Sequence, residues 1–429
     1  MDRFIRLWVG QLASTIGSYM TVFALMLWAW DITGTATSLT LVAFFSQLPR
    51  IAITPLAGIV VDRFPRKHLM VLGDGVAMAC TLAIGFLYGS DRLQIWHLYS
   101  AVALYGCFGQ IQNLAYSTSI ALLVPKRDYT RAESMVSAVN YSGAIFSPLL
   151  AGSLYPLIGL SGIIGIDLIT FWVAMGTLLA TPIPSPLRQS SQTAFSRGNL
   201  TFGFRYILQR PGLTAMVIAF SLFALPSDMG RALYSPMILA RSGGDAQVLG
   251  LVTTAAGVGG VVGALLLSWH GGFKRRIHGM LLGFAGTGFF KLLLGWGQAP
   301  WVWAPAHFTA TLLTPLYYSA SNAIWYAKVP PALQGRVLAA DQMVGLVIGA
   351  IAPLLAGPLA DRVFEPAMAP EGRLAPLLGP WLGTGPGAGI ALLYSLMATL
   401  MTLVGLLGYS FQPLRSVETA LPDHSESHS

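Results

Sequence analysis

The stretch PLAGIVVDRFPRKHLM, residues 55–70, sets the frame for reading the whole chain. Seven apolar or small residues precede a cluster of four charges at positions 62, 63, 66 and 67, and the apolar sequence resumes directly after it. Charge is scarce elsewhere in this sequence, so its concentration here indicates a short polar turn between two apolar helices.

Composition places the chain among membrane proteins. Of 429 residues, 54% are hydrophobic and 10% are charged, whereas soluble proteins carry about 25% charged residues. So little polar surface cannot cover so large an apolar core in water. The net charge of +8 could indicate nucleic-acid binding, but the charges form short clusters between apolar runs. This distribution favours an orientation signal in the membrane, and we expect no nucleic-acid partner.

Twelve apolar runs of membrane-spanning length follow one another along the sequence. A helix needs about 20 residues to cross the hydrocarbon core. The runs lie near residues 6–30, 38–61, 68–89, 94–123, 134–158, 161–181, 213–240, 247–269, 277–297, 301–327, 338–360 and 387–411. We therefore expect an all-α integral membrane protein with two six-helix bundles, residues 1–182 and 213–412. A central loop (183–212) and a polar tail (413–429) complete the predicted organisation.

The lysines and arginines predict the orientation of these helices. With the N-terminus inside the cell, the cytoplasmic loops hold 18 of the 25 basic residues, and the outer loops hold 4. This asymmetry follows the positive-inside rule. We expect a multi-pass protein of the plasma (inner) membrane with both termini in the cytoplasm.

The two halves repeat each other at an offset of 205 residues. SPLLAG at 147–152 matches APLLAG at 352–357, and the Val-Pro pair at 124–125 matches the pair at 329–330. Each half is therefore predicted to be a copy of one six-helix unit in the same orientation. Parallel repeats of this kind are typical of transporters with a binding site near the bilayer midplane.

With these features, the chain resembles the major facilitator superfamily over nearly its whole length. The family's signature G-x-x-x-D-R-x-x-R-R/K is present as Gly58, Asp62, Arg63, Arg66 and Lys67. Within the superfamily, the signature and LVPKRDYTRAESM at 123–135 look most like the branch of macrolide-efflux and enterobactin-export proteins. The resemblance implies two pseudo-symmetric bundles that alternate access to the two sides of the membrane.

The first signature is interpreted in two ways. The resemblance implies a conformational latch. In it, Asp62 accepts hydrogen bonds near Arg336, at the start of the eleventh expected span (338–360), and stabilises the outward-open state. The plainer interpretation is a topology anchor in a tight inner turn.

A second signature lies in the fifth expected span (134–158) and recurs in the eleventh (338–360). Small residues there allow close helix approach, and a proline kinks a helix. Generic helix packing accounts for such residues, but their matched positions in both halves favour a shared hinge or sliding surface. The residues concerned are Gly143, Ser147, Pro148, Gly152, Pro353 and Gly357.

Polar residues inside the spans are candidates for substrate or ion contacts, because a charge at membrane depth costs about 2.5–3.5 kcal/mol. Asp228 and Arg231 have i,i+3 spacing and are predicted to pair, either structurally or as part of a site. For Arg50 the open alternatives are a partner at Asp31 or an anionic substrate. The remaining candidates on the central helices are Gln110, Gln112, Asn113, Asn322 and Trp325.

Two further acids within the expected spans are assigned structural roles. Asp167 lies near the outer end of helix 6, where a hydrogen-bonded role is expected. Asp74 lies early in helix 3 and is expected to pair with the arginines of the first signature. The family's proton-coupled drug antiporters carry an arginine in helix 4, whereas this chain has amides at 110, 112 and 113. H⁺ is the expected coupling ion, and this departure leaves the ion open.

The function expected from these features is secondary active export of a small amphipathic or apolar compound, drug-like or siderophore-like, by alternating access. An importer and a flippase for lipid-like molecules are alternatives within the same fold. A membrane sensor or enzyme is the alternative from another class, but the sequence has no soluble domain and no catalytic set of side chains. We expect a monomer without cofactor or metal.

Overall fold

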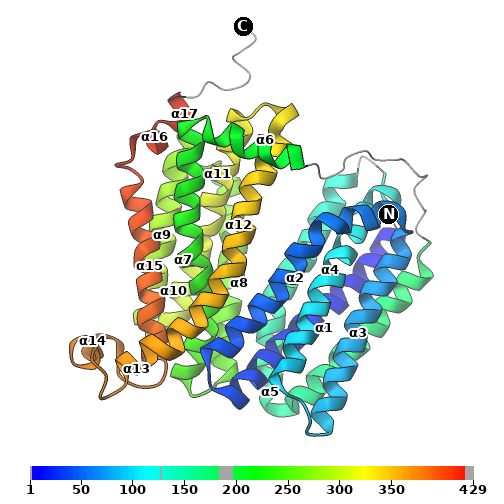
Figure 1. Cartoon of the computed structure of the whole chain (residues 1–429). Coiled ribbons are helices and arrows are strands. Elements are labelled where there is room, and N and C mark those ends of the chain that lie inside the picture. Colours follow the sequence, from blue (N-terminus) through cyan, green and yellow to red (C-terminus); the bar gives the residue numbers. More distant parts are fainter. Residues whose placement is uncertain (1, 126–127, 183–196, 421–429) are drawn as a thin grey trace. The chain divides into compact units, whose positions relative to one another are not determined.

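The computed structural model describes residues 2–125, 128–182 and 197–420, and the regular elements of this part of the chain are all helices. They group into two compact units (Figure 1). The first comprises Met1–Ala194 with Gly244–Thr254, and the second comprises Phe195–Gly243 with Ala255–Ser429. The all-α prediction is confirmed.

The first unit is built from long helices. They are α1 (Asp2–Thr33), α2 (Ala36–Arg63), α3 (Arg66–Gly89), α4 (Ile95–Leu123) and α5 (Tyr129–Ala180). The first turns of α8 (Ala246–His270) also belong to this unit. Helix α5 contains two expected spans, which meet at Gly159, where φ is 62° and ψ is −171°. Only glycine adopts this backbone conformation at low cost, so the helix direction changes there.

The link between α2 and α3 is the charged turn of the opening stretch. Phe64 is extended, with φ −110° and ψ 151°, because a residue that precedes proline avoids the helical region. Pro65 follows with φ −58° and occupies the N-cap of α3. The proline therefore ends one helix and starts the next within two residues.

The second unit contains the remaining helices. They are α6 (Arg197–Leu208), α7 (Pro211–Ser242), the rest of α8, α9 (Arg276–Trp296), α10 (Pro300–Leu312), α11 (Thr314–Lys328), α12 (Pro331–Leu359), η2 (Ala360–Phe364), α13 (Glu365–Met368), α14 (Ala375–Leu382), α15 (Ala388–Leu407), α16 (Gln412–Arg415) and α17 (Val417–Ala420). The expected span 301–327 is divided between α10 and α11. The polar central segment contains α6, and the segment between the last two expected spans, 338–360 and 387–411, contains α13 and α14.

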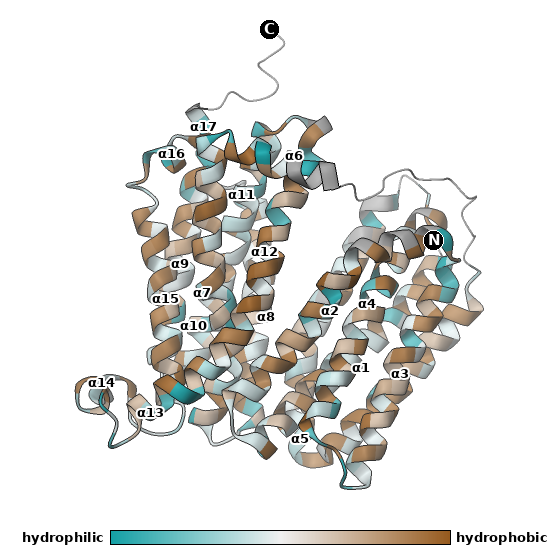
Figure 2. Ribbon diagram, in the orientation of Figure 1, coloured by the Kyte–Doolittle hydropathy of each residue, from teal (hydrophilic) through white to brown (hydrophobic). Residues whose placement is uncertain are grey.

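Many of these helices are suited to a membrane. Among the described residues, nine helical segments are long and apolar enough to cross one: Arg3–Thr33, Ala36–Thr54, Arg66–Gly89, Ser134–Ala180, Pro211–Ser242, Ala246–His270, Arg276–Trp296, Leu333–Met368 and Ala388–Leu407. Figure 2 shows hydrophobic residues along the full length of these helices. On α15, exposed leucines at 396, 400, 403 and 407 form a stripe suited to lipid contact. The count of twelve spans stays a prediction.

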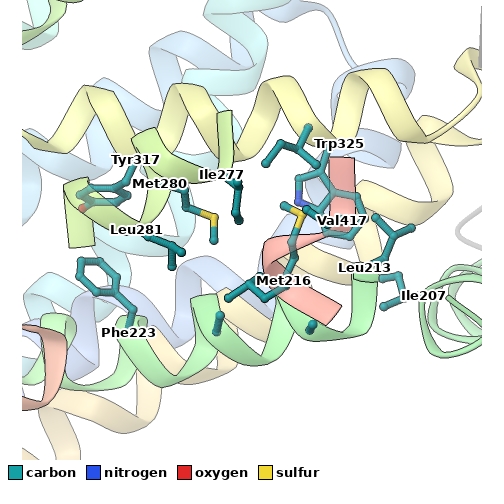
Figure 3. Packing of buried hydrophobic residues seen from close by; sticks show 14 of the residues in the cluster. Ile207, Leu213, Met216, Phe223, Ile277, Met280, Leu281, Tyr317, Trp325 and Val417 are labelled. Carbon is teal, nitrogen blue, oxygen red and sulfur yellow. The ribbon is translucent and has the colours of Figure 1, made fainter. Parts of the chain in front are cut away.

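Each unit has its own apolar core. In the first unit, one cluster joins Leu7 of α1, Val61 of α2, Met70 of α3, Ala115 of α4 and Leu178 of α5. In the second unit, Phe223 of α7 stacks on Phe284 of α9 with ring centroids 3.8 Å apart, and Tyr317 of α11 packs against both rings (Figure 3). These clusters hold the helices that carry the polar residues described next.

Candidate functional site

Arg50 of α2 has a partner on α4. Its Nε donates a hydrogen bond of 2.8 Å to Oε1 of Gln110. The helices approach closely at Gly106, where an added Cβ would lie 2.6 Å from the carbonyl oxygen of Ser46. The terminal nitrogens of Arg50 make no hydrogen bond with any described residue. Two residues predicted independently as substrate contacts are therefore brought together, with part of the guanidinium left available.

Asp74 of α3 is bonded to a second glutamine of α4. It is 3% exposed, and Nε2 of Gln112 donates to its Oδ1. The sequence had suggested the arginines of the charged turn as its partners. Gln112 was predicted as a substrate contact, and the structure instead places its amide against a buried carboxylate. Asn113, the next candidate on this helix, is exposed.

The charged turn is fastened within the first unit. Arg66 Nη1 donates to the carbonyl oxygen of Thr118 at 2.7 Å, and Lys67 Nζ donates to the carbonyl oxygens of Leu179 and Thr181 at 2.7 and 3.0 Å. Lys67 thus binds free carbonyls at the C-terminus of α5, where positive charge is favoured, and Arg66 binds a carbonyl in the C-terminal part of α4. Arg63 is exposed.

The side chains of Gly58 and Asp62 lie outside the described residues, although the α2 backbone there is helical. The latch predicted for the first signature therefore stays a prediction.

The second signature is a packing surface on α5. Ser147 is fully buried, and its hydroxyl donates to the carbonyl oxygen of Ile16 in α1 at 2.9 Å. A Cβ at Gly143 would lie 3.1 Å from Cγ2 of Thr15, and a Cβ at Gly152 would lie 2.7 Å from the carbonyl oxygen of Ala246. Small residues are therefore required on two sides of α5.

The first turns of α8 fit against this surface. A Cβ at Gly250 would lie 2.6 Å from the carbonyl oxygen of Pro148, and the Thr254 hydroxyl donates to the carbonyl oxygen of Ile145 at 3.1 Å. The matched residues of α12, Pro353 and Gly357, are buried, and α12 passes within a few residues into the π-helix η2. The hinge role of the second signature and of its repeat in α12 stays a prediction.

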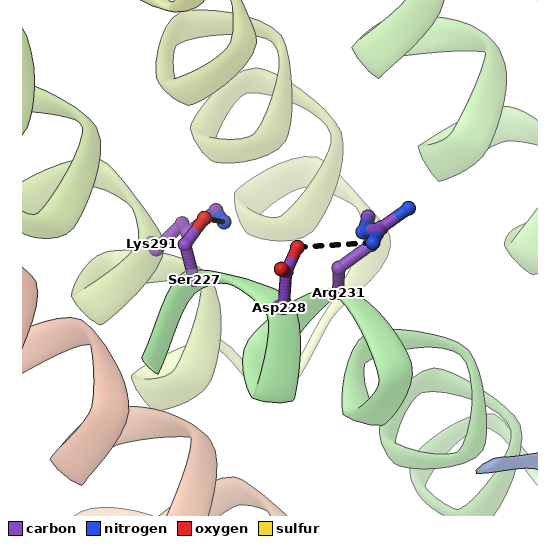
Figure 4. A network of polar contacts seen from close by, with 4 residues as sticks. All are labelled: Ser227, Asp228, Arg231 and Lys291. Atoms are coloured by element: carbon purple, nitrogen blue, oxygen red, sulfur yellow. Dashed lines mark hydrogen bonds and ion pairs between the residues drawn. The ribbon is translucent and has the colours of Figure 1, made fainter. Parts of the chain in front are cut away.

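The charged residues of α7 form an ion pair (Figure 4). Arg231 Nη2 lies 2.9 Å from Asp228 Oδ1, as the i,i+3 spacing predicted, and the two side chains are 58% and 23% exposed. Ser227 accepts a hydrogen bond of 3.4 Å from Lys291 of α9. A Cβ at Gly349 of α12 would lie 3.5 Å from Asp228, so a glycine faces this pair.

The two candidates on α11 differ in environment. Asn322 is exposed. Trp325 is 2% exposed and belongs to the core of the second unit, together with Met216 and Val417 (Figure 3). Its indole therefore contacts the interior of the bundle in this structure.

Glu418, which the sequence did not single out, organises the end of the second unit. Its two carboxylate oxygens accept the backbone amides of Arg276 and Ile277 at 3.1 and 3.0 Å. A carboxylate at a helix N-terminus satisfies free amides and the helix dipole. Lys328 Nζ donates 2.5 Å to the backbone carbonyl of Glu418.

A set of apolar helices with a few paired polar groups inside them is typical of a multi-pass membrane protein. The chain belongs to the Major Facilitator Superfamily, whose sequence profile matches residues 7–353. The predicted fold and the predicted family are therefore confirmed. In the described part of the chain, no three His, Cys, Asp or Glu side chains are grouped to hold a metal ion.

Relatives and solved structures agree with this assignment. Macrolide efflux protein A of Streptococcus pyogenes is 23% identical over 376 residues, which are 84% of this chain and 90% of that protein. Enterobactin exporter EntS of Citrobacter koseri is 24% identical over 308 residues, 69% of this chain and 71% of that protein. A bacterial homolog of the human lysosomal transporter Spinster has the same fold, with a TM-score of 0.71 at 14% identity, covering 98% of this chain and 99% of that one.

Proposed function

We propose that this protein is a secondary active transporter that exports small amphipathic or apolar compounds, of a drug-like or siderophore-like kind, by alternating access. Transport is coupled to an ion, with H⁺ as the first candidate. Membership of the superfamily and the efflux names of its relatives support export. The 18 basic residues assigned to the inner loops support a plasma-membrane protein with both termini in the cytoplasm.

The observation that carries the proposal is the pair Arg50–Gln110. An arginine inside an apolar span is costly and is retained where it has a task. Gln110 fixes the guanidinium through Nε alone, which leaves the fork of terminal nitrogens for a substrate oxygen. A bulky compound with an apolar body and one polar or anionic edge matches this arrangement.

The other predicted residues complete the working proposal. Asp228 and Arg231 supply a second polar pair, and Asn113 and Asn322 supply exposed amides. The latch at Asp62 and the small-residue surface of α5 serve the conformational change. The protein acts as a monomer.

Inside-out membrane vesicles test the proposal. With an imposed pH gradient, acidic inside, we expect the vesicles to accumulate a radiolabelled macrolide or iron-free enterobactin. Arg50→Ala should lower uptake about tenfold, because a charge-assisted hydrogen bond contributes about 1.5–3 kcal/mol. Arg50→Lys should keep part of the activity, and Arg92→Ala, in an exposed turn, is the matched control.

Other outcomes separate the alternatives. Uptake only in right-side-out vesicles would show an importer. Transbilayer movement of a fluorescent phospholipid, without uptake of either compound, would show a flippase.

A further inference from the structure

A buried carboxylate without a counter-ion lies inside the first unit. Asp74 is 3% exposed, and Gln112 satisfies its Oδ1. Its Oδ2 is buried and has no hydrogen-bond partner among the described residues. No described basic side chain forms an ion pair with Asp74, whose hydrogen-bond partner is the Gln112 amide. A buried charge in this state must gain a proton or a cation, because an isolated ion in a low dielectric is very costly.

The position of Gln112 is fixed by the backbone of α3. An added Cβ at Gly73 would lie 2.6 Å from Cβ of Gln112 and 2.7 Å from its Oε1. Only a glycine at 73 therefore lets the amide lie beside the carboxylate of the next residue. Met70 and Ala77, one turn to either side, are 0% and 5% exposed. The pair is thus a constructed polar contact within an apolar interface.

None of the described ionisable groups around Asp74 donates a hydrogen bond to its Oδ2. Helix α3 packs against α4 and α5, which carry Tyr105, Tyr116 and Asp167 toward this region. The cations at the start of α3, Arg66 and Lys67, donate to main-chain carbonyls.

On α1, Gln11 has a buried Nε2 without a partner among the described residues. Gln11 follows Leu7 by one turn, as Asp74 follows Met70, and Leu7 and Met70 belong to one cluster. A second unsatisfied polar atom therefore belongs to the same region of the core.

We propose that Asp74 takes up the coupling proton of the transporter. This inference rests on the proposed function and assigns the ion site within it. A proton from water adds to Oδ2 of the carboxylate and gives the neutral acid, and the same O–H bond breaks when the proton leaves. One carboxylate and one amide suit a proton better than a metal ion, since hard cations such as Ca²⁺ require six or more oxygen ligands.

Helix α4 connects this site to the substrate candidate. Gln112 holds Asp74, and two residues earlier Gln110 holds Arg50. A neutral acid accepts a weaker hydrogen bond than a carboxylate, so protonation loosens Gln112 from α3. The resulting freedom of α4 acts on the Arg50–Gln110 pair. The amides thus take the place of the helix-4 arginine that this chain lacks.

Asp167 provides a matched comparison. It is 1% exposed, but Ser18 donates to its Oδ1 at 3.3 Å and Thr81 donates to its Oδ2 at 3.4 Å. Both oxygens of this carboxylate have hydroxyl partners, as the structural role predicted for it requires. Asp167→Asn therefore changes a buried carboxylate of the same unit without removing the proposed proton site.

The test combines infrared and transport measurements on the full-length protein in lipid. Infrared difference spectra between acid and alkaline pH contain the C=O stretches of all titrating carboxylic acids, and we expect one component that Asp74→Asn removes and Asp167→Asn leaves. In vesicles, wild-type protein that exchanges one proton per substrate should sustain a substrate concentration ratio of about tenfold per pH unit. Asp74→Asn should abolish this accumulation. Downhill exchange of the radiolabelled macrolide should stay within about twofold of wild type.

An Asp74→Asn spectrum with the same C=O intensity as wild type overturns the proposal, as does gradient-driven accumulation by that variant. If Asp74→Asn does not fold, Gln112→Leu is measured instead. It should shift the pH at which the C=O band of Asp74 titrates, because the hydrogen bond from Gln112 to the carboxylate is lost. An unshifted band then counts against Asp74. If the wild type transports neither compound, the proposed function fails, whereas the infrared titration still decides the proton site.

Discussion

The guanidinium of Arg66 donates to the carbonyl oxygen of Thr118 at 2.7 Å and ties the first turn of α3 to the last turns of α4. The second unit contains the same contact, because Arg276 Nη1 at the start of α9 donates to the carbonyl oxygen of Ala323 in α11 at 2.9 Å. Thr118 and Ala323 are 205 residues apart, the offset of the sequence repeat. The repeat therefore preserves a specific hydrogen bond as well as a pattern of small residues.

Loss of either arginine should destabilise the protein. Arg66→Ala and Arg276→Ala each remove a charge-assisted hydrogen bond to a main-chain carbonyl of a neighbouring helix, and we expect each to cost about 1–3 kcal/mol. The apparent melting temperature of the purified protein in detergent should fall in both, and Arg92→Ala should leave it unchanged. Equal melting temperatures for all three variants would show that the two bonds are dispensable.

Glu418 should stabilise the second unit through the start of α9. Replacing an N-cap side chain costs about 0.5–2 kcal/mol, so Glu418→Ala should lower the melting temperature, and Glu418→Gln should lower it less. The exposed Glu371, replaced by alanine, is the control. Removing residues after 410 should be more harmful, because Leu414 and Val417 are 1% and 0% exposed and their burial is lost with the cap. A truncated protein as stable as the full chain would contradict this role.

The small-residue surface of α5 can be tested with two glycines of the same helix. A Cβ at Gly152 would lie 2.7 Å from the Ala246 carbonyl, whereas a Cβ at Gly165 would meet nothing within 4 Å. Gly152→Ala should overpack the contact, at a cost of about 1–3 kcal/mol, and slow vesicle uptake. Gly165→Ala should be neutral or stabilising by up to about 1 kcal/mol, because alanine favours helix. If both variants behave alike, close packing at 152 has no special importance.

The Asp228–Arg231 pair can be assigned by a double-mutant cycle. Since Arg231 is 58% exposed, the coupling energy for stability should stay below about 1 kcal/mol. We expect Asp228→Asn and Arg231→Gln each to lower uptake about tenfold through loss of a substrate or ion contact, and the double variant to stay low. Normal uptake by the double variant would identify the pair as self-neutralised and structural.

Helix boundaries and local pairs could be predicted from the sequence. The apolar runs indicated the helices, the charges at 62–67 indicated the turn between α2 and α3, and the runs ending at 158 and resuming at 161 indicated a break near Gly159. The ion pair of α7 followed from i,i+3 spacing. These features depend on residues close together in sequence, where helix geometry alone determines what can meet.

The contacts between helices could not be predicted in the same way. Arg50 and Gln110 are 60 residues apart, and Asp74 and Gln112 are 38 apart. Their meeting depends on which faces of α2, α3 and α4 pack together, and glycines at 73 and 106 make that approach possible. The role of Glu418 could not be predicted for the same reason, because the tail has no apolar pattern to show that it packs against the start of α9.

Arg241 gives the charge asymmetry of the loops a further meaning. Its guanidinium donates to the carbonyl oxygens of Gly295, Gly297 and Leu382. These hydrogen bonds satisfy main-chain carbonyls at the ends of α9 and α14. In the orientation we propose, it is one of four basic residues outside. Arg241 therefore bridges the ends of α9 and α14, so a neutral residue in its place would disturb folding as well as remove an outer positive charge.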